Sequence, residues 1–336
     1  MLLTSIHVHN ILNARINDMY NVLVVDFSPY RDDITSLFRN NGYEVAVCEN
    51  AFEAMSKLRA YDFDLVVSEV ELPGDNAFDL YNYLNKNYPY IPAIMTTDKS
   101  IDAFFDKIFN EGIGNVLKKP LKESEVLNLS QKLITKNNIF NITNYLKDAV
   151  DTKRIRIQGS RQIQKAIAAV IRQINEWGFP IANKMALTLV LNELAINAVY
   201  HSHGLTLEKE ERRPVQLGEN EYVDIHFSHN NGEYAISITD YKGCLSKMKI
   251  LDSINRVIVQ ENLITKASET GEDISDFVTE TGRGIDLVRK LSGEYYFIIK
   301  KDVKTEIILI FSREGAAAPK MQNNSSLKII EDNSET

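Results

Sequence analysis

Cysteine is scarce in this chain, and long apolar runs are absent. Only Cys48 and Cys244 occur among 336 residues, and neither has a CxxC partner. That usage predicts two reduced core thiols in a cytosolic protein rather than a disulfide-stabilised secreted one. No run reaches the roughly 18 apolar residues that cross a membrane, and the N-terminus lacks the basic region and long apolar core of a signal peptide. We therefore expect a cytoplasmic protein without a membrane segment.

Positive charge is also in short supply. The formal net charge is -8, with 38 Lys and Arg against 46 Asp and Glu. Nucleic-acid backbones bind basic surfaces, so this balance argues against a broad nucleic-acid interface. At 336 residues the chain is long enough for about two domains of the usual ~100–200 residues.

Five short apolar runs alternate with stretches of helical periodicity between residues 21 and 135. Strands that alternate with helices in this way form a parallel sheet covered on both faces. The pattern therefore predicts a doubly wound, flavodoxin-like α/β domain over residues 21–135. Ligands bind such sheets at the carboxyl ends of the strands. The five runs are NVLVVDF, YEVAVCE, DLVVSEV, PAIMTT and NVLKKP.

Residues 153–312 follow a different pattern: one strand, two helices, and then two pairs of antiparallel strands separated by a long irregular stretch and a glycine-introduced helix. We expect an α/β two-layer sandwich with helices on one face of the sheet. The remaining segments are predicted to be an N-terminal extension (1–20), a helical linker (136–152) and a disordered tail (313–336). The linker fits either rigid signal transmission or ordinary packing.

A polar row runs along the helix predicted near residues 181–202. Glu193, Asn197 and His201 recur every four residues in LNELAINAVYH, which places them on one helix face. An unpartnered buried amide costs on the order of 2–7 kcal/mol, so something polar must face this row. A metal ion and phosphates would qualify.

Three sequence boxes carry a resemblance in this second domain. LNELAINAVYH resembles the N-box of the GHKL (Bergerat-fold) ATPases, ITDYKGC their first glycine box and TGRGIDLVRKL their second. Their order and separation are most similar to the serine-kinase anti-sigma factors within that superfamily. The resemblance covers about residues 153–312 and implies that ATP and Mg²⁺ are the cofactors.

The N-box and the second glycine box have roles that fit phosphate chemistry. The carboxamide of Asn197 and the nucleotide phosphates could complete the oxygen shell of Mg²⁺. Glu193, one turn away, is placed to orient or deprotonate an attacking hydroxyl. Gly282 and Gly284 let backbone amides approach phosphate oxygens at the start of a helix, and Arg283 adds positive charge.

The first glycine box departs from the family pattern. By the resemblance, Asp240 would accept the adenine amino group, with Gly243 in the same box and Thr305 nearby on the last strand. The family usually has glycine where Lys242 stands, and a side chain there would crowd the adenine or resist a positive φ. The stretch from Tyr241 to Thr281 would form the ATP lid. A domain that binds ATP but has lost catalysis therefore stays an alternative.

The first domain resembles a response-regulator receiver. In that family, acidic residues after the first strand hold magnesium, and an aspartate after the third strand accepts phosphate. Here Asp26 remains and Phe27 replaces its acidic neighbour. Glu69 occupies the acceptor position, while Thr97 and Lys119 keep the family positions.

Glutamate at the acceptor position has a physical consequence. Its side chain is one methylene longer than aspartate, so its carboxylate would crowd an incoming phosphoryl group. Glu69 either mimics the phosphorylated form or makes a structural ion pair with Lys119, and both alternatives predict no phosphorylation. Phe27 predicts weak magnesium binding. Val116 stands where many receivers carry a switch aromatic, which argues against ordinary switching.

Histidine is absent from residues 121–180, which excludes the phosphoacceptor helix of a histidine kinase. The resemblance implies phosphoryl transfer to a serine or threonine of a STAS-domain antagonist, or sequestration of a sigma factor. We therefore expect a cytoplasmic signalling regulator, an anti-sigma-type protein serine/threonine kinase controlled by a non-phosphorylatable receiver-like domain. A catalytically weak or inactive ATP-binding module that holds a regulatory partner is the alternative. By analogy a homodimer is possible, and no nucleic-acid or membrane partner is expected.

Overall fold

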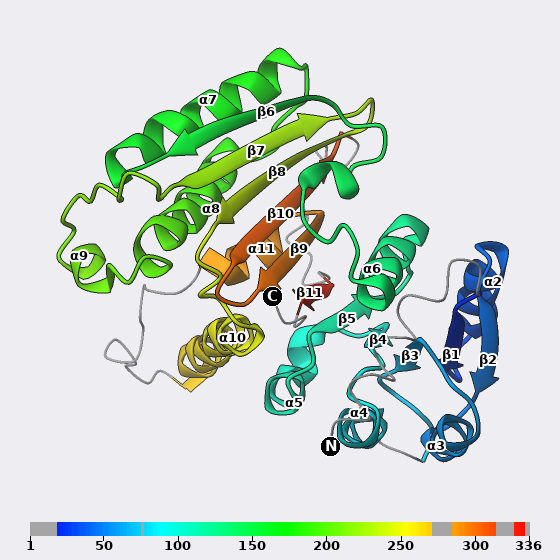
Figure 1. The fold of residues 1–336 in the computed structure, drawn as a ribbon. Helices are drawn as coiled ribbons and strands as arrows, with labels where there is room; N and C mark the ends of the chain where they lie inside the picture. Colours follow the sequence, from blue (N-terminus) through cyan, green and yellow to red (C-terminus); the bar gives the residue numbers. More distant parts are fainter. Residues whose placement is uncertain (1–18, 75–76, 271–283, 314–325, 333–336) are drawn as a thin grey trace, which may run out of the picture. The chain divides into compact units, whose positions relative to one another are not determined.

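The computed structural model describes residues 19–74, 77–270, 284–313 and 326–332. The chain divides into two compact units, residues 1–95 and residues 96–336, and each is described by itself (Figure 1). In the described part of the chain, every helix is too short or too polar to traverse a lipid bilayer.

The first unit is built on a parallel sheet. Its central strand β1 pairs in parallel with β2 on one side and β3 on the other, with Val22 opposite Val45 and Leu65. Residues 22–25 of β1 and all of β3 are buried, as expected for strands covered on both faces. The predicted parallel α/β domain is confirmed here. The elements are β1 (Asn21–Val25), α2 (Arg31–Asn40), β2 (Glu44–Cys48), α3 (Ala51–Ala60), β3 (Leu65–Glu69), α4 (Ala77–Asn87) and β4 (Ala93–Thr97), which crosses into the second unit.

The second unit contains one continuous sheet. The strands lie in the order β5-β11-β9-β10-β8-β7-β6, and all neighbours are antiparallel except β11 and β9. The strands are β5 (Asn115–Lys118), β6 (Val150–Ile157), β7 (Val223–His229), β8 (Glu233–Asp240), β9 (Glu294–Lys300), β10 (Lys304–Ser312) and β11 (Leu327–Asp332).

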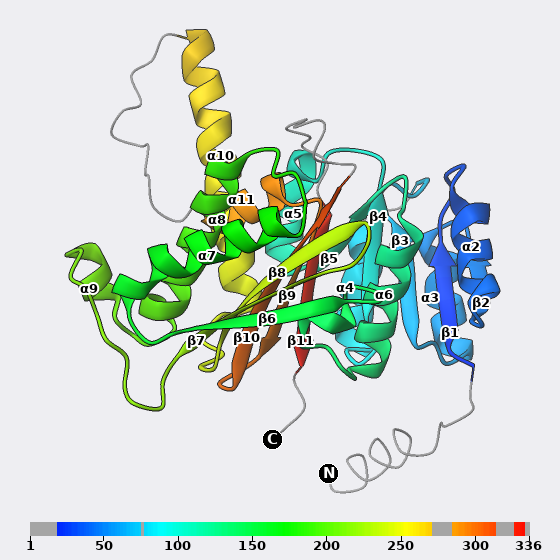
Figure 2. The same cartoon turned by 90° about the horizontal axis from the view of Figure 1, so that it is seen from above.

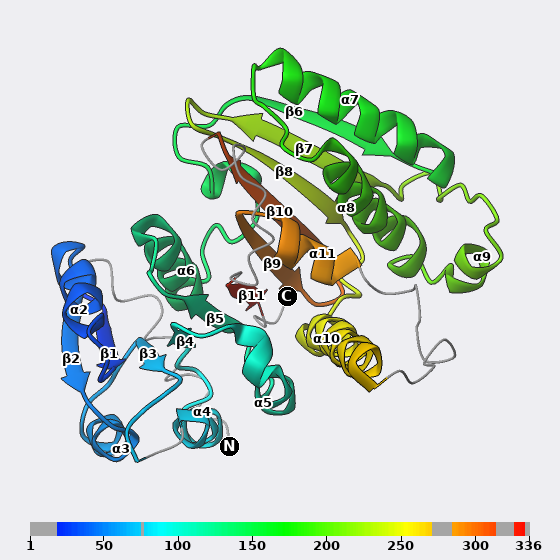
Figure 3. The same ribbon diagram turned by 180° about the vertical axis from the view of Figure 1, so that it is seen from behind.

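Helices cover one face of strands β6 to β10. Figure 2 shows α7, α8 and α11 on the same side of these strands, and α8 packs against both of the others. Helix α10 lies beside α5 (Figure 3). The helices and short turns are η1 (Ile101–Phe104), α5 (Phe105–Glu111), α6 (Glu123–Thr135), η2 (Ile142–Asn144), η3 (Ser160–Gln162), α7 (Ile163–Glu176), α8 (Lys184–Ile196), η4 (Asn197–His201), α9 (Thr206–Glu210), α10 (Lys247–Thr270) and α11 (Gly284–Leu291).

The expectation of a disordered tail over residues 313–336 is wrong for residues 327–332. These residues form β11, in which Leu327, Ile329 and Ile330 are buried. Val116 of β5 lies opposite Leu327, and Phe297 of β9 lies opposite Ile329. Strand β11 thus satisfies the backbone groups of two strand edges that would otherwise stay open.

The helical linker predicted over residues 136–152 is also wrong. Only one 3₁₀ turn, η2, forms there, and strand β6 already begins at Val150. Asn138 and Asn141 have φ values of 51° and 81°, which a right-handed helix does not allow. Of the four apolar residues with helical spacing, Ile139, Ile142 and Leu146 are nevertheless buried, whereas Val150 is exposed.

The two cysteines are both free, but they differ in environment. Cys48 is buried at the end of β2, and burial raises the pKa of its thiol to about 11. Cys244 is exposed in the loop after β8. The expectation of two core thiols is therefore wrong for Cys244, because its short loop lies at the surface between β8 and α10.

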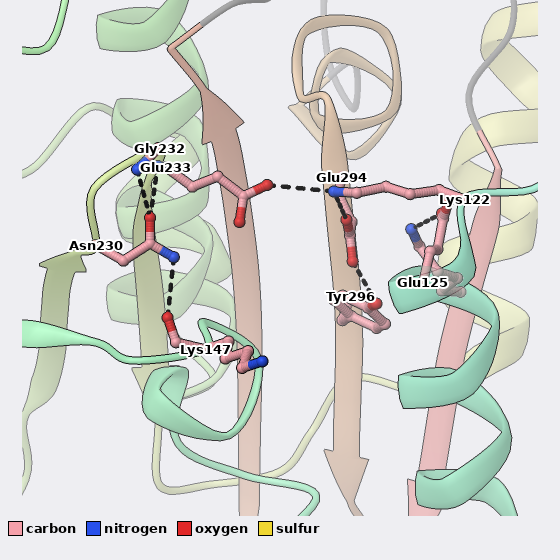
Figure 4. A network of polar contacts seen from close by, with 9 residues as sticks. Lys122, Glu125, Lys147, Asn230, Gly232, Glu233, Glu294 and Tyr296 are labelled. Carbon is pink, nitrogen blue, oxygen red and sulfur yellow. Dashed lines mark hydrogen bonds and ion pairs between the residues drawn. The ribbon is translucent and has the colours of Figure 1, made fainter. Parts of the chain in front are cut away.

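A polar network ties α6 to the sheet of the second unit (Figure 4). The Nζ of Lys122, just before α6, lies 3.0 Å from a carboxylate oxygen of Glu294 and 3.2 Å from one of Glu233. The buried Lys328 of β11 pairs with Glu125 of α6. The hydroxyl of Tyr296 donates to Glu294 at 2.5 Å. Burial raises the pKa of Glu294, but Lys328 and Lys122 outweigh this effect and hold it below its ordinary value.

The substitution Ile330→Ala is expected to destabilise the second unit. It removes a fully buried side chain from β11, and such changes cost about 2–5 kcal/mol. Urea unfolding followed by the fluorescence of Trp177, the single tryptophan, measures the loss. The exposed Lys301→Ala change is the control, and an equal, small effect of both would contradict the packing described for β11.

Acid is expected to weaken the second unit through Glu294. Folding lowers the pKa of Glu294 below its ordinary value of 4.5, so the ionised carboxylate stabilises the fold at pH values above 4.5. This contribution is lost as the pH falls through the lowered pKa. Glu294→Gln should therefore make the urea midpoint less sensitive to pH between neutrality and the acid range. Glu219→Gln, at an exposed site, should leave the acid sensitivity as in the wild type.

Candidate functional site

The polar row lies where α8 passes into η4. Glu193 is in the last turn of α8, Asn197 begins the π-helical turn and His201 ends it. The N–H of Ser202 donates to the carbonyl of Asn197, five residues earlier, at 3.2 Å. Single π turns within helices are frequent at functional sites, because they change the direction of the side chains that follow.

Lys209 of α9 faces this row, although no sequence pattern marks it. Its ammonium Nζ donates to Asn197 Oδ1 at 3.0 Å and lies 2.9 Å from His201 Nε2. Burial lowers the pKa of Lys209 below its ordinary value, and the charge of Glu193 offsets only part of this shift. Burial, and then Lys209, lower the pKa of His201, so its neutral ring accepts from the ammonium. Within TLEKEERR, Lys209 has the pattern of an ordinary solvated helix.

The start of α11 lies directly against the polar row. A Cβ atom added to Gly284 would lie 2.8 Å from Glu193 Cβ, closer than side chains approach. Glycine is therefore required at this position because α11 begins in contact with Glu193. Gly282 and Arg283 lie outside the described residues, so their predicted phosphate contacts stay predictions.

Asp240 ends β8 and is buried. Its Oδ1 accepts the backbone N–H groups of Lys242 and Gly243, each at 3.0 Å. Burial raises the pKa of Asp240, and these two N–H groups and the hydroxyls of Ser202 and Thr305 oppose the rise. Thr305 lies directly opposite Asp240 in β10. Its buried Oγ1 lies near the Asp240 carboxylate and has no other partner among the described residues.

Lys242 does not meet the backbone strain that was expected for a side chain at this position. Its backbone has no positive φ; Gly243 takes the left-handed conformation instead, at φ 61°. A Cβ on Gly243 would also lie 2.6 Å from the N atom of Val303, so glycine is required there twice over. The ammonium of Lys242 forms an ion pair with Glu221.

The predicted receiver residues are buried, two in each unit. In the first unit, Asp26 follows β1, its Oδ1 accepting the N–H of Ser28 at 2.6 Å, and Glu69 ends β3. In the second unit, the N–H of Lys119 donates to the carbonyl of Thr97 at 2.7 Å. An ion pair of Glu69 with Lys119 would join the two units, so it stays a prediction.

A buried charge cluster connects α11 to η1. Arg289 is 2% exposed, and its Nη2 lies 2.7 Å from Asp286 Oδ1. Its Nη1 pairs with Asp102, which follows β4 by a few residues. The spacing of Asp286 and Arg289 is visible in GIDLVRKL, but the third member lies 187 residues from Arg289 in sequence, so no local pattern reveals it.

The described residues offer few ligands for a divalent ion. Among them, no group of three or more His, Cys, Asp or Glu side chains lies together in a way that could hold one. At the N-box, the Asn197 oxygen that would bind Mg²⁺ already accepts from Lys209. Even two unit charges about 4 Å apart repel by about 4 kcal/mol at an effective dielectric of 20. As it stands, this donor set does not fit magnesium.

Comparison with known proteins finds relatives for the N-terminal part of the chain. Residues 22–131 match the response regulator receiver domain family. Protein PilH of Pseudomonas aeruginosa is 30% identical over 116 residues, covering 32% of this chain and 93% of PilH. The probable transcriptional regulator ycf29 of Pyropia yezoensis is 30% identical over 100 residues, covering 29% of this chain and 45% of that protein. The chain thus spans about half the length of several curated relatives that it matches.

Solved receiver structures match the same part. The chemotaxis response regulator CheY4 of Vibrio cholerae is 25% identical, with a TM-score of 0.32, covering 34% of this chain and 99% of that one. Through residues 22–131 the chain belongs to the response regulator receiver domain family. The chain thus contains a response regulator receiver domain.

Proposed function

We propose that the C-terminal part of this receiver-domain regulator binds ATP and phosphorylates a serine or threonine of a protein partner. The observation that carries the proposal is the convergence of three sequence boxes within the second unit. Gly284 of the second glycine box abuts Glu193 of the N-box. Asp240 of the first glycine box lies close to Ser202, the residue after η4. Segments about 40 residues or more apart in sequence therefore meet at one end of α8.

The residues around Asp240 suit an adenine ring. Buried polar groups almost always have partners, and the hydroxyl of Thr305 has none but the Asp240 carboxylate within the described residues. A flat ligand with an exocyclic amino group could donate to Asp240, whose other carboxylate oxygen is held by two backbone N–H groups. Such a ligand would also supply a second partner for Thr305. This fit supports ATP as the bound nucleotide.

Glu193 is the proposed general base. When bound, ATP supplies the phosphoryl group to be transferred. Glu193 would accept the proton of the attacking hydroxyl, and its position is fixed by contact with the first residue of α11. The proposed acceptor is a STAS-domain antagonist. A sigma factor or another regulator, and a second copy of this chain, are further proposed partners.

In this proposal, the receiver would control the activity at Glu193 through contacts within the second unit. Glutamate at position 69 does not form the aspartyl phosphate of ordinary receivers, so a fixed or docked state is proposed for the receiver. Asp102 lies five residues after Thr97, and it pairs with Arg289 on α11. The first residue of α11 touches Glu193. These contacts form a continuous packed route from the end of β4 to the proposed base, and this continuity supports the proposed coupling.

A second candidate function is a binding module without chemistry. The contact between Lys209 and Asn197 favours it, because the predicted magnesium ligand is already engaged. Such a module would bind ATP weakly and hold a sigma factor or another regulator.

Labelled ATP and candidate STAS-domain partners test the kinase proposal. Transfer to the partner is expected, and Glu193→Gln should slow it about 10²–10⁴-fold, the usual contribution of a general base. Glu176→Gln, on the exposed surface of α7, is the matched control. Transfer that survives Glu193→Gln unchanged would remove Glu193 from the chemistry. ATP binding without any transfer would select the second candidate function.

Asp102→Asn tests the proposed control route. The substitution removes one charged partner of the buried Arg289, which should weaken the local stability of α11 by about 1–3 kcal/mol. Hydrogen exchange of the α11 amides should speed up, and phosphoryl transfer should change with it. Asp106→Asn, exposed on α5, serves as the control. Faster exchange in α11 with an unaltered transfer rate would refute the route.

A further inference from the structure

Lys209 occupies the place where a cation is expected in the N-box. Its ammonium lies 3.0 Å from Asn197 Oδ1 and 2.9 Å from His201 Nε2, and it is close enough to Glu193 for the two charges to attract. The lysine is half-buried, so it does not extend freely into solvent. The polar row of an otherwise apolar helix is therefore satisfied from within the chain.

The geometry of the ammonium leaves one donor for a ligand. A lysine has three N–H groups and no acceptor. Two of them are directed to Asn197 and His201, and no further partner of Nζ is found among the residues that the structure describes. His201 acts as a positioning residue, because its ring nitrogen holds the ammonium beside Asn197. The third N–H is available for an anion such as a phosphate oxygen.

We propose that Lys209 takes the place of the divalent ion as the phosphate counter-charge of this site, so that the chain binds ATP without a divalent metal. The inference rests on the proposed function, since it concerns the same nucleotide. A lysine binds phosphate as a point charge, as magnesium does, but it is carried by the chain itself and needs no water shell. A magnesium ion on the same Asn197 oxygen would have to displace it.

Calorimetric titration of ATP into the full chain tests this proposal, in excess EDTA and in excess magnesium. The wild type is expected to bind ATP with similar affinity in both conditions. Lys209→Gln keeps a polar side chain but removes the charge, and it should weaken binding in EDTA by about tenfold or more, as expected for a charged hydrogen bond. Added magnesium should restore part of that loss, because the Asn197 oxygen is then free. Lys165→Gln, exposed on α7, is the matched control.

The opposing outcomes are distinct. Binding by the wild type only in magnesium would overturn this inference and leave the proposed function standing. Equal binding by the wild type and Lys209→Gln in EDTA would also overturn it, since the lysine would then not contact phosphate. Absence of ATP binding by the wild type in both conditions would overturn the proposed function together with this inference. The wild-type comparison needs no variant, so it stands even if Lys209→Gln fails to fold.

Discussion

The pairing of β11 with both β5 and β9 is the constraint on which the second unit depends. Lys328 and Leu327 face β5, and the residues that follow face β9, so one six-residue strand closes two edges. The N–H of Ile329 donates to the carbonyl of Gly114 at 3.0 Å. Once this register is set, α6, η1 and α5 are held against the elements that carry the candidate site, and the buried pairs of Arg289 and Lys328 can form.

The regular parts of the fold could be predicted because their sequence signals are local. Apolar runs such as VLVV and LVVS are long enough to mark buried parallel strands. Strand β11 was not predicted because LKII is a short apolar run among Asn, Ser and Glu, a composition typical of disorder. Its order comes from two distant strand edges, and no local pattern reports those.

The candidate site shows the same division. Glu193, Asn197, Asp240 and Gly284 were selected from local sequence patterns, and the structure brings Gly284 against Glu193. Lys209 and Asp102 could not be found in this way, because each is an ordinary charged residue in its own segment. What distinguishes them is that each lies beside a partner in the folded chain, which tertiary packing decides. Asp102 and Arg289, for example, are 187 residues apart in sequence.

Strand β11 also sets an order of events during synthesis. Asn115 of β5 and Ile329 of β11 are 214 residues apart, and the amide of Ile329 donates to the side chain of Asn115 at 3.1 Å. At translation rates of about 5–20 residues per second, β5 leaves the ribosome roughly 10–40 s before its partner strand exists. During that interval the edge of β5 is open to pairing with other chains. The nascent protein thus keeps an open edge for misassembly for as long as the sheet lacks this short strand.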